Sequence, residues 1–209
     1  MPTIQDLFSK VYRKGKDKEL YVLGIMGSPR DDGNSDILLD RALEGVKSAG
    51  ARWEKINLCG LSFSGCFECG DTSDDGSCKI ADDMQLVYSK IQEADAIVLA
   101  CPVFFGSLNA QTKLMIDRFQ CLWRAKNVLK TVKPAQQKKS GAFICVQASQ
   151  RKEFFENSRA IVKNFFATVD TEYRQELSCP GVDEKAGILK HPEMLRRAFE
   201  LGQRVVNER

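Results

Sequence analysis

Apolar residues recur along this chain in two alternating patterns, one typical of strands and one typical of helices. Uninterrupted apolar runs of about six residues are typical of strands buried on both faces of a parallel sheet. Less regular apolar segments between them predict weaker strands. The predicted strands cover residues 21–26, 51–58, 96–101, 141–146 and 172–177. We expect the strand at 96–101 to end at Pro102.

The second pattern is an apolar stripe that returns every three or four residues, as in amphipathic helices. Asp82 and Asp83 precede one such stripe, where negative charge suits a helix N-terminus. The predicted helices cover residues 37–46, 84–91, 110–123, 154–166 and 194–205. Alternation of buried strands with amphipathic helices predicts an α/β fold, in which helices cover both faces of a parallel sheet.

Length and composition predict one domain of residues 20–209, preceded by an N-terminal extension of residues 1–19. The extension has apolar residues at helical spacing before a basic run, and it is expected to pack on its own domain or on a partner subunit. These apolar residues are Ile4, Leu7, Phe8, Val11 and Tyr12.

Charge and cysteine content narrow the function classes. The chain has 31 Lys and Arg against 28 Asp and Glu, a net charge of +3, with both signs interspersed. We therefore expect no nucleic-acid partner, which would need a basic face. Residues 1–20 carry charges where a signal peptide needs apolar residues, and no run is long enough to span a membrane. A cytoplasmic protein is predicted, in which the eight cysteines are thiols or ligands.

The loop between the first strand and the first helix has the composition of a phosphate site. Glycines at 27 and 33 allow close approach of the backbone, a forked cation stands at Arg30, and short polar side chains stand at positions 28, 34 and 35. The loop lacks both the Gly-Lys-Ser/Thr ending of a Walker loop and the G-x-G-x-x-G fingerprint. It suits a terminal monophosphate. The alternative is an ordinary glycine turn with a Ser or Asn helix cap.

Two further loops should meet the first one, because ligands of such sheets bind beyond the carboxyl ends of the strands. Residues 102–107 combine a rigid proline, apolar surface and glycine, so they could flank a planar ring. Residues 147–150 offer amide and hydroxyl groups to ring heteroatoms. The alternative for Phe104 and Phe105 is packing in the core. A planar ring carried on a sugar phosphate matches FMN better than a dinucleotide.

Four motifs resemble the NAD(P)H-dependent FMN reductase family of flavodoxin-like proteins: the Gly-Ser-Pro-Arg-x-x-Gly-Asn-Ser loop, residues 94–98, residues 102–107, and Lys113-x3-Asp117-Arg118. The resemblance implies a doubly wound five-stranded parallel sheet of order 2-1-3-4-5, bound FMN, and a homodimer or homotetramer. The implied phosphate contacts are Ser28, Arg30, Gly33, Asn34 and Ser35. The implied ring contacts are Pro102, Val103, Phe104, Phe105, Gly106, Ala148, Ser149 and Gln150.

Cysteines 66, 69 and 78 resemble the loop of the iron-sulfur flavoprotein branch of this family. That branch carries a C-x2-C-x2-C run with a fourth cysteine after it, and here the third place is Thr72. Cys59 could supply the missing thiolate. Three readings stay open: an iron-sulfur cluster on Cys59, Cys66, Cys69 and Cys78, a zinc or redox site at the C-x-x-C pair, or a thiol loop without metal.

The remaining candidate residues are interpreted as structural. Cys101 and Cys145 lie in apolar strands and are expected in the core, whereas Cys121 and Cys179 have no predicted role. Lys113, Asp117 and Arg118 are expected to form ion pairs or subunit contacts. The single histidine, His191, precedes a proline and suits a cap or surface position. A hydrolase triad therefore lacks a base.

These observations predict an FMN-dependent oxidoreductase that takes hydride from NAD(P)H, its co-substrate. It would pass electrons through bound flavin to a small acceptor such as a flavin, a quinone or a metal ion. Flavin chemistry needs orientation and exclusion of water from the protein, so no catalytic side chain is predicted. The alternatives are a dehydrogenase of one metabolite, an electron carrier that uses the cysteine loop, and a non-catalytic interaction protein.

Overall fold

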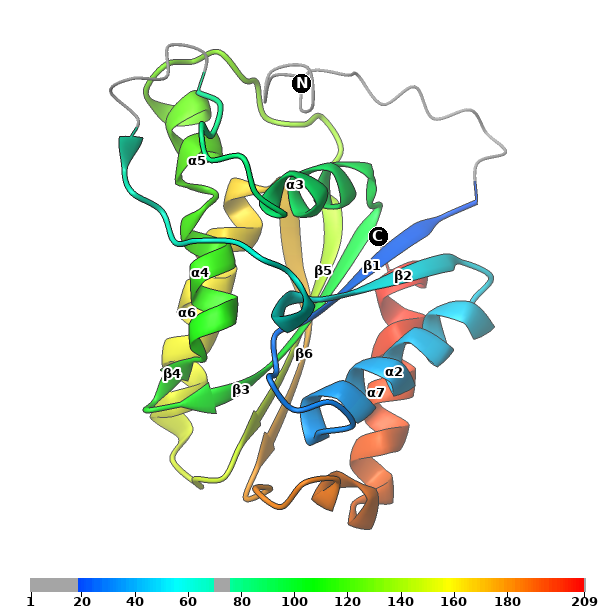
Figure 1. Ribbon diagram of the computed structural model, residues 1–209. Helices are drawn as coiled ribbons and strands as arrows, with labels where there is room; N and C mark the ends of the chain where they lie inside the picture. Colours follow the sequence, from blue (N-terminus) through cyan, green and yellow to red (C-terminus); the bar gives the residue numbers. More distant parts are fainter. Residues whose placement is uncertain (1–18, 70–75, 209) are drawn as a thin grey trace.

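A computed structural model describes residues 19–69 and 76–208, and Figure 1 shows a single twisted sheet between two helical layers. The predictions for the N-terminal helix and for Thr72 lie outside the described residues. The parallel strands are β1 (Tyr21–Met26), β2 (Arg52–Asn57), β3 (Ala96–Phe104), β5 (Lys139–Gln147) and β6 (Thr171–Pro180). Their order, β2-β1-β3-β5-β6, is the predicted 2-1-3-4-5 order of a flavodoxin-like sheet.

Helices cover both faces of the sheet, as the alternating pattern predicts. The helices on one face are α2 (Asn34–Ser48) and α7 (Pro192–Asn207). Those on the other face are α3 (Met84–Glu93), α4 (Ala110–Asp117), α5 (Gln120–Asn127) and α6 (Lys152–Thr168). The 3-10 turns are η1 (Leu58–Gly60) and η3 (Gly187–Lys190). Among the described helices, none is both long and apolar enough to cross a bilayer.

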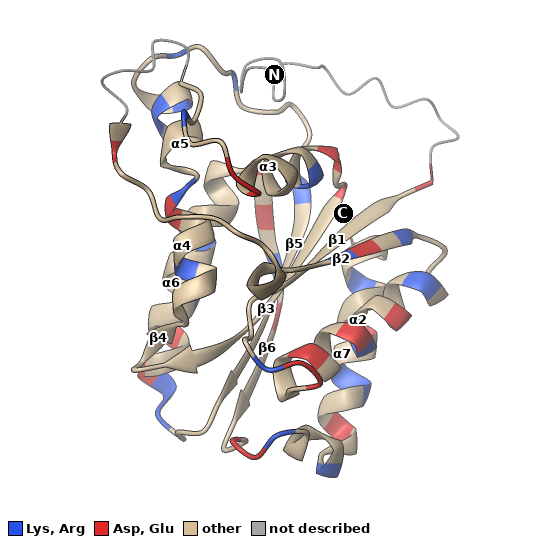
Figure 2. Cartoon of the chain, viewed as in Figure 1, with Lys and Arg blue, Asp and Glu red and all other residues tan. Residues whose placement is uncertain are grey.

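The strand side chains divide between two cores because successive residues of a strand point to opposite faces. In β1, Tyr21, Leu23 and Ile25 join the core under α3 to α6, whereas Val22 and Met26 join the core under α2 and α7. Outside these cores, both signs of charge occur on α2 and on α7 (Figure 2), and several of them pair within one helix. The expected core positions of Cys101 and Cys145 are confirmed.

The predicted end of the third strand is wrong. Strand β3 continues through Pro102, which pairs in register with Val146 of β5, and it ends at Phe104. The extension is possible because Phe104 and Val103 then pair antiparallel with β4 (Ser107–Leu108). The hairpin that lengthens the strand depends on this pairing rather than on an apolar run.

The predicted single helix over residues 110–123 is also wrong, because it divides into α4 and α5. At the junction, the amides of Arg118 and Phe119 donate to carbonyls three residues earlier, as in a tightened 3-10 turn. The carbonyl of Arg118 accepts hydrogen bonds from the Tyr88 hydroxyl at 2.8 Å and the Cys121 thiol at 3.2 Å. Side-chain contacts at this carbonyl accompany the break in the helix.

Candidate functional site

The structure brings the three predicted loops to one edge of the sheet. They follow β1, β3 and β5, which are neighbours in the strand order, so their carboxyl ends lie side by side at the lower edge in Figure 1. A fourth loop, between β6 and η3, reaches the same edge and contacts the first loop. This arrangement is the one in which doubly wound sheets bind ligands.

The first loop ends in a helix N-terminus that has no side-chain cap. Gly33 is the N-cap of α2, and the first helical hydrogen bond runs from the Ile37 amide to the Gly33 carbonyl at 2.9 Å. The amides of residues 34–36 precede this bond, as at the start of any helix. Asn34 and Ser35 stand inside the helix, so the alternative in which one of them caps it is wrong.

Several side chains of the first loop form hydrogen bonds that hold the loop in place. The Ser28 hydroxyl accepts a hydrogen bond from the Arg30 amide at 3.1 Å, and the Arg30 guanidinium donates to the Asp183 carbonyl at 3.1 Å. The Asn34 amide donates to the Glu184 carbonyl at 2.9 Å and accepts from the Ile188 amide at 3.0 Å. Both ends of the Asn34 side chain thus tie the loop after β6 to α2, a role that its position in the motif does not reveal.

Asn109 and Thr112 form a buried support beneath the first loop that sequence reasoning missed. Asn109 donates to the Gly27 carbonyl at 2.5 Å, and the Thr112 hydroxyl donates to Asn109 Oδ1 at 2.7 Å. A Cβ at Gly27 would lie 2.0 Å from Thr112 Oγ1, so only glycine fits there. The only signal for this support was two small polar residues at the start of a predicted helix.

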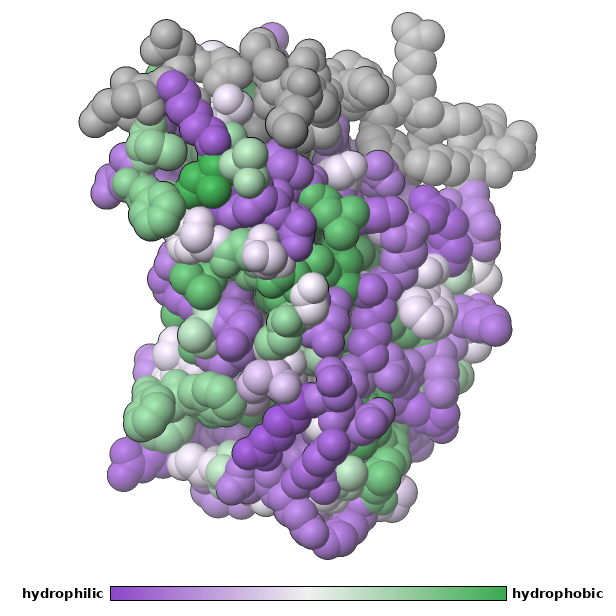
Figure 3. All heavy atoms as spheres, viewed as in Figure 1, coloured by the Kyte–Doolittle hydropathy of each residue, from purple (hydrophilic) through white to green (hydrophobic). Residues whose placement is uncertain are grey.

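The second loop is a tight hairpin turn with an exposed aromatic tip. Phe105 and Gly106 both have positive φ, +51° and +77°, as the type I′ turn requires. The Phe105 side chain is fully exposed and that of Phe104 is 42% exposed, so the alternative of core packing is wrong. Figure 3 shows hydrophobic atoms gathered at this hairpin. Asn157 of α6 donates to the Gly106 carbonyl at 3.2 Å and holds the turn in place.

The third loop is clamped by the last residue of β5. The buried Gln147 amide donates to the carbonyls of Ser149 and Arg151, both at 2.8 Å. The Ser149 hydroxyl accepts from the Arg151 amide at 3.1 Å. Ala148 and Gln150 are left exposed at the sheet edge. The predicted residues of this loop are therefore held in position by hydrogen bonds of Gln147 and Ser149.

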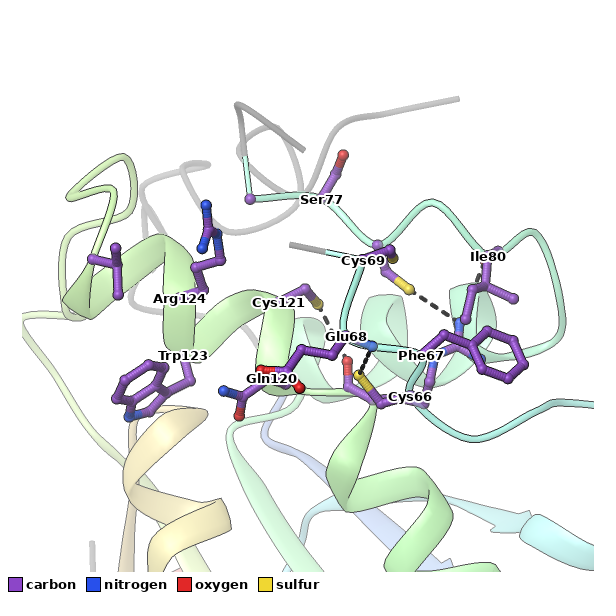
Figure 4. A pocket seen from close by; sticks show the side chains of 14 residues that line it. Cys66, Phe67, Glu68, Cys69, Ser77, Ile80, Gln120, Cys121, Trp123 and Arg124 are labelled. Atoms are coloured by element: carbon purple, nitrogen blue, oxygen red, sulfur yellow. Dashed lines mark hydrogen bonds between the residues drawn. The ribbon is translucent and has the colours of Figure 1, made fainter. Parts of the chain in front are cut away.

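The cysteine loop forms a second candidate site, away from the three loops. A cavity of about 490 Å³ lies between this loop and α5 (Figure 4). Its lining includes Cys66, Cys69, Cys78, Cys121, Arg118 and Trp123. The structure does not bring Cys59 there, because its thiol donates to the Ser28 carbonyl beside the first loop, at 3.4 Å. Within residues 19–69 and 76–208, no three Cys, His, Asp or Glu side chains are placed to hold a single metal ion.

Arg118 holds the cysteine loop against the junction of α4 and α5. Its side chain is inaccessible to solvent and forms a two-pronged ion pair with Asp82, at 2.5 and 3.1 Å. It also donates to the Ser64 carbonyl at 3.0 Å and to Cys78 Sγ at 3.2 Å. Partial burial opposes ionisation of Asp82, but hydrogen bonds from Arg118 and from the amides of Ser64 and Met84 together outweigh it and lower the pKa of this carboxyl. The expectation of a structural role for Arg118 is confirmed.

The neighbouring ion pair is simpler. Lys113 and Asp117 pair at 2.7 Å on the exposed side of α4, one helical turn apart, as predicted. His191 is the exposed N-cap of α7 and lies 3.6 Å from Glu193, so the predicted cap or surface position is confirmed.

Cys121 is the functional candidate that its sequence position did not reveal. It lies in the first turn of α5 and lines the cavity together with Cys78. Hydrogen bonding to Cys121, followed by the Ile80 amide and Arg118, lowers the pKa of Cys78 to about 5 despite partial burial. Hydrogen bonding to Cys78, and then burial, raise the pKa of Cys121. The pKa values of the two thiols are thus shifted in opposite directions, and Cys78 is the more acidic.

The comparisons with known proteins agree with this architecture. Residues 20–170 match the family model described as NADPH-dependent FMN reductase. An iron-sulfur flavoprotein of Methanocaldococcus jannaschii is 39% identical over 97 residues, 46% of this chain and 50% of that protein. One of Methanosarcina thermophila is 36% identical over 109 residues, 52% of this chain and 57% of that protein. The chain thus spans about half the length of these relatives.

Solved structures share the fold. A flavone reductase has a TM-score of 0.68 at 22% identity, over 90% of this chain and 62% of that one. An NAD(P)H:quinone oxidoreductase from Methanothermobacter marburgensis has a TM-score of 0.65 at 17% identity, over 90% and 95% of the two chains. The family model covers most of the chain, including all three predicted loops at the sheet edge. The chain therefore belongs to the NADPH-dependent FMN reductase family.

Proposed function

We propose that this protein is an FMN-dependent NAD(P)H oxidoreductase that passes electrons through bound flavin to a small acceptor, such as a flavin or a quinone. The observation that carries the proposal is the uncapped start of α2 beside two loops suited to a ring. Three amides at a helix N-terminus favour an anion, and Arg30 adds a cation at the same loop. The donor set therefore fits a flavin phosphate.

The predicted contacts divide into two groups. Ser28, Arg30, Gly33 and Ser35, with the amide of Asn34, would hold the phosphate. The ring would lie between the hairpin, residues 102–106, and the clamped loop, residues 148–150. The first of these offers exposed aromatic and apolar surface, and the second offers exposed backbone and amide groups. An apolar face on one side and hydrogen-bonding groups on the other suit a flat heterocycle.

The bound flavin would supply hydride acceptance and onward electron transfer. The protein's own contribution is orientation and exclusion of water. The Asn109 and Gln147 contacts hold two of the loops rigidly, so that the binding geometry is formed before the ligand arrives. Amides of the ring loops could stabilise negative charge on the ring. We assign no side chain as an acid or base.

We further propose that the protein acts as a homodimer or homotetramer. The support is the exposed aromatic pair of the hairpin, Phe104 and Phe105, which stands at the proposed ring site without cover from the described part of its own chain. Exposed aromatic surface of this kind is typical of interaction sites. The absence of a nucleic-acid or membrane partner and the cytoplasmic location stay predictions.

The test measures FMN binding and NAD(P)H oxidation separately. Purified protein, freed of flavin, is titrated with FMN and the quenching of flavin fluorescence is followed. We expect Arg30→Ala to weaken FMN binding at least about tenfold, the cost of one charge-assisted contact. Arg196→Ala, which removes an exposed arginine of α7 paired with Glu200, is the matched control. Oxidation of NADH and NADPH is then followed with flavin or quinone as acceptor. Failure to bind FMN would contradict the proposal.

A second candidate function is an electron carrier of the iron-sulfur flavoprotein type. Its support is the cavity with four cysteines, together with the description of the archaeal relatives as iron-sulfur flavoproteins. An electron carrier would accept electrons from a reduced protein donor such as ferredoxin and would not oxidise NAD(P)H in the steady state. Steady-state NAD(P)H oxidation with any of the acceptors therefore favours the oxidoreductase over the carrier.

A further inference from the structure

Four cysteines from two separate segments line one cavity. Cys66, Cys69 and Cys78 come from the loop between η1 and α3, whereas Cys121 comes from α5, 43 positions after Cys78. Figure 4 shows the side chains of Cys66, Cys69 and Cys121 at the same opening. A four-iron cluster takes four thiolates, and its family motif in this chain lacks one. The cavity therefore presents four thiols, whereas the described part of the loop supplies three of them.

The residue expected from sequence to complete the set lies elsewhere. Cys59 follows β2 in the turn η1, and its thiol donates to the Ser28 carbonyl of the proposed phosphate loop. It is absent from the cavity lining. Recruiting it would require breaking this contact and refolding the turn. Cys121 needs no such rearrangement, because it already lines the cavity together with Cys78.

Positive charge lies beside the cavity that Cys121 lines from the first turn of α5. The buried guanidinium of Arg118 lies 3.2 Å from Cys78 Sγ and offsets the charge of a group of thiolates. Within the described residues, no three Cys, His, Asp or Glu side chains are placed to bind a single metal ion. In a four-iron cluster each thiolate binds a different iron atom, so the four thiols need not converge on one point.

We propose that Cys121 is the fourth ligand of an iron-sulfur cluster in this cavity, with Cys66, Cys69 and Cys78, and that Cys59 is not a ligand. On ligation, each thiol releases its proton to solvent and forms one bond from sulfur to iron. The inference rests on the second candidate function only for the presence of a cluster. It does not depend on FMN binding, so the two proposals can fail separately.

The first experiment uses the unmodified protein. It is reconstituted without air from ferrous iron and sulfide, and cysteine alkylation by iodoacetamide is mapped by mass spectrometry before and after reconstitution. At alkaline pH, which offsets the raised pKa of Cys121, we expect this thiol to be alkylated in the iron-free protein and protected in the reconstituted protein. Cys59 should be alkylated equally in both. Equal alkylation of Cys121 in both states, or protection of Cys59 instead, would overturn the assignment.

The second experiment compares Cys121→Ser with Cys59→Ser. Iron and sulfide content and the low-temperature EPR spectrum of the reduced protein are measured for each. The wild type should hold about four iron atoms per chain, the content of one four-iron cluster. Cys121→Ser should lose at least about half of this iron or change its EPR spectrum, whereas Cys59→Ser should match the wild type. The reverse pattern would overturn the assignment, and so would a wild type without iron in which peroxide links Cys78 to Cys121 as a disulfide.

FMN binding and circular dichroism are measured on the same samples. A variant that loses iron but keeps its FMN binding and its circular dichroism spectrum has lost a cluster ligand and not its fold. Iron binding through Cys121 in a protein without FMN affinity would support the cluster assignment and contradict the proposed oxidoreductase. FMN binding in a protein that takes up no iron would contradict the cluster assignment and support the proposed oxidoreductase.

Discussion

The two candidate sites of this molecule are built in different ways. The sheet edge consists of loops that directly follow buried strands, and the third of these loops is also fixed by a local contact of Gln147 with Ser149. The cysteine cavity depends on contacts across long stretches of chain, above all those of Arg118 with Asp82, 36 residues away. A site of the first kind follows from the strands. A site of the second kind exists only once the chain has folded.

The largest expected effect on stability comes from the ion pair of Arg118 with Asp82, which belongs to the cysteine cavity. Arg118→Leu leaves the partly buried Asp82 carboxylate without its partner and removes the anchor of the cysteine loop. We expect the free energy of unfolding to fall by about 3 to 5 kcal/mol, the usual cost of breaking a buried pair. Urea unfolding measures it. Lys113→Ala, which breaks the exposed pair on the same helix, should cost less than about 1 kcal/mol.

FMN affinity decides whether the two sites are independent. At temperatures where Arg118→Leu remains folded, FMN should bind with wild-type affinity, because Arg118 contacts the cysteine loop and none of the three loops at the sheet edge. A parallel loss of FMN affinity would mean that the cavity and the sheet edge form one cooperative unit, and the contrast between them would fail.

The second prediction tests the support beneath the first loop. Gly27→Ala places a methyl group against Thr112 Oγ1. Overpacking of this kind costs about 1 to 3 kcal/mol, and the displaced loop should bind FMN more weakly. Thr112→Ala removes the obstructing hydroxyl, so the double variant should be less destabilised than the sum of the two single variants. Additive losses in urea unfolding would show that this contact does not explain the glycine.

The difference between the two sites also explains what could be predicted from the sequence. The strands at 21–26, 96–101 and 141–146 were predictable because burial on both faces leaves unbroken apolar runs. The loops after them were predictable because sheet topology places consecutive loops together. The extension of β3 past Pro102 was not, because it depends on pairing with β4. Nor was the place of Cys121 in the cavity lining, because Cys78, which lines the same cavity, belongs to a distant segment.

The third prediction concerns the acid stability of the cavity. Arg118 lowers the pKa of Asp82 in the folded protein, so the unfolded chain binds a proton there more readily than the folded chain does. The stabilisation from this pair is therefore complete above the unfolded pKa of about 4 and is lost as the pH falls through the lower folded value. Asp82→Asn should be less stable at neutral pH, and its stability should fall less between about pH 5 and pH 3. Urea midpoints across this range measure the slope, and equal slopes would contradict a lowered pKa of Asp82 in the folded protein.

The smallest expected effect lies at the aromatic tip of the sheet edge. Phe105 adopts a left-handed backbone that asparagine accepts more readily, and its exposed ring makes little contact with its own chain. Phe105→Asn should therefore raise the free energy of unfolding by about 0.5 to 1 kcal/mol, measured on the flavin-free protein at a concentration low enough to keep it monomeric. The same variant should weaken FMN binding or self-association, because the ring is proposed to serve one of them. A strained, exposed aromatic residue with no effect on either would remove the reason for placing function at this hairpin, whereas a gain in stability with a loss of binding would show that the strain is kept for the ligand.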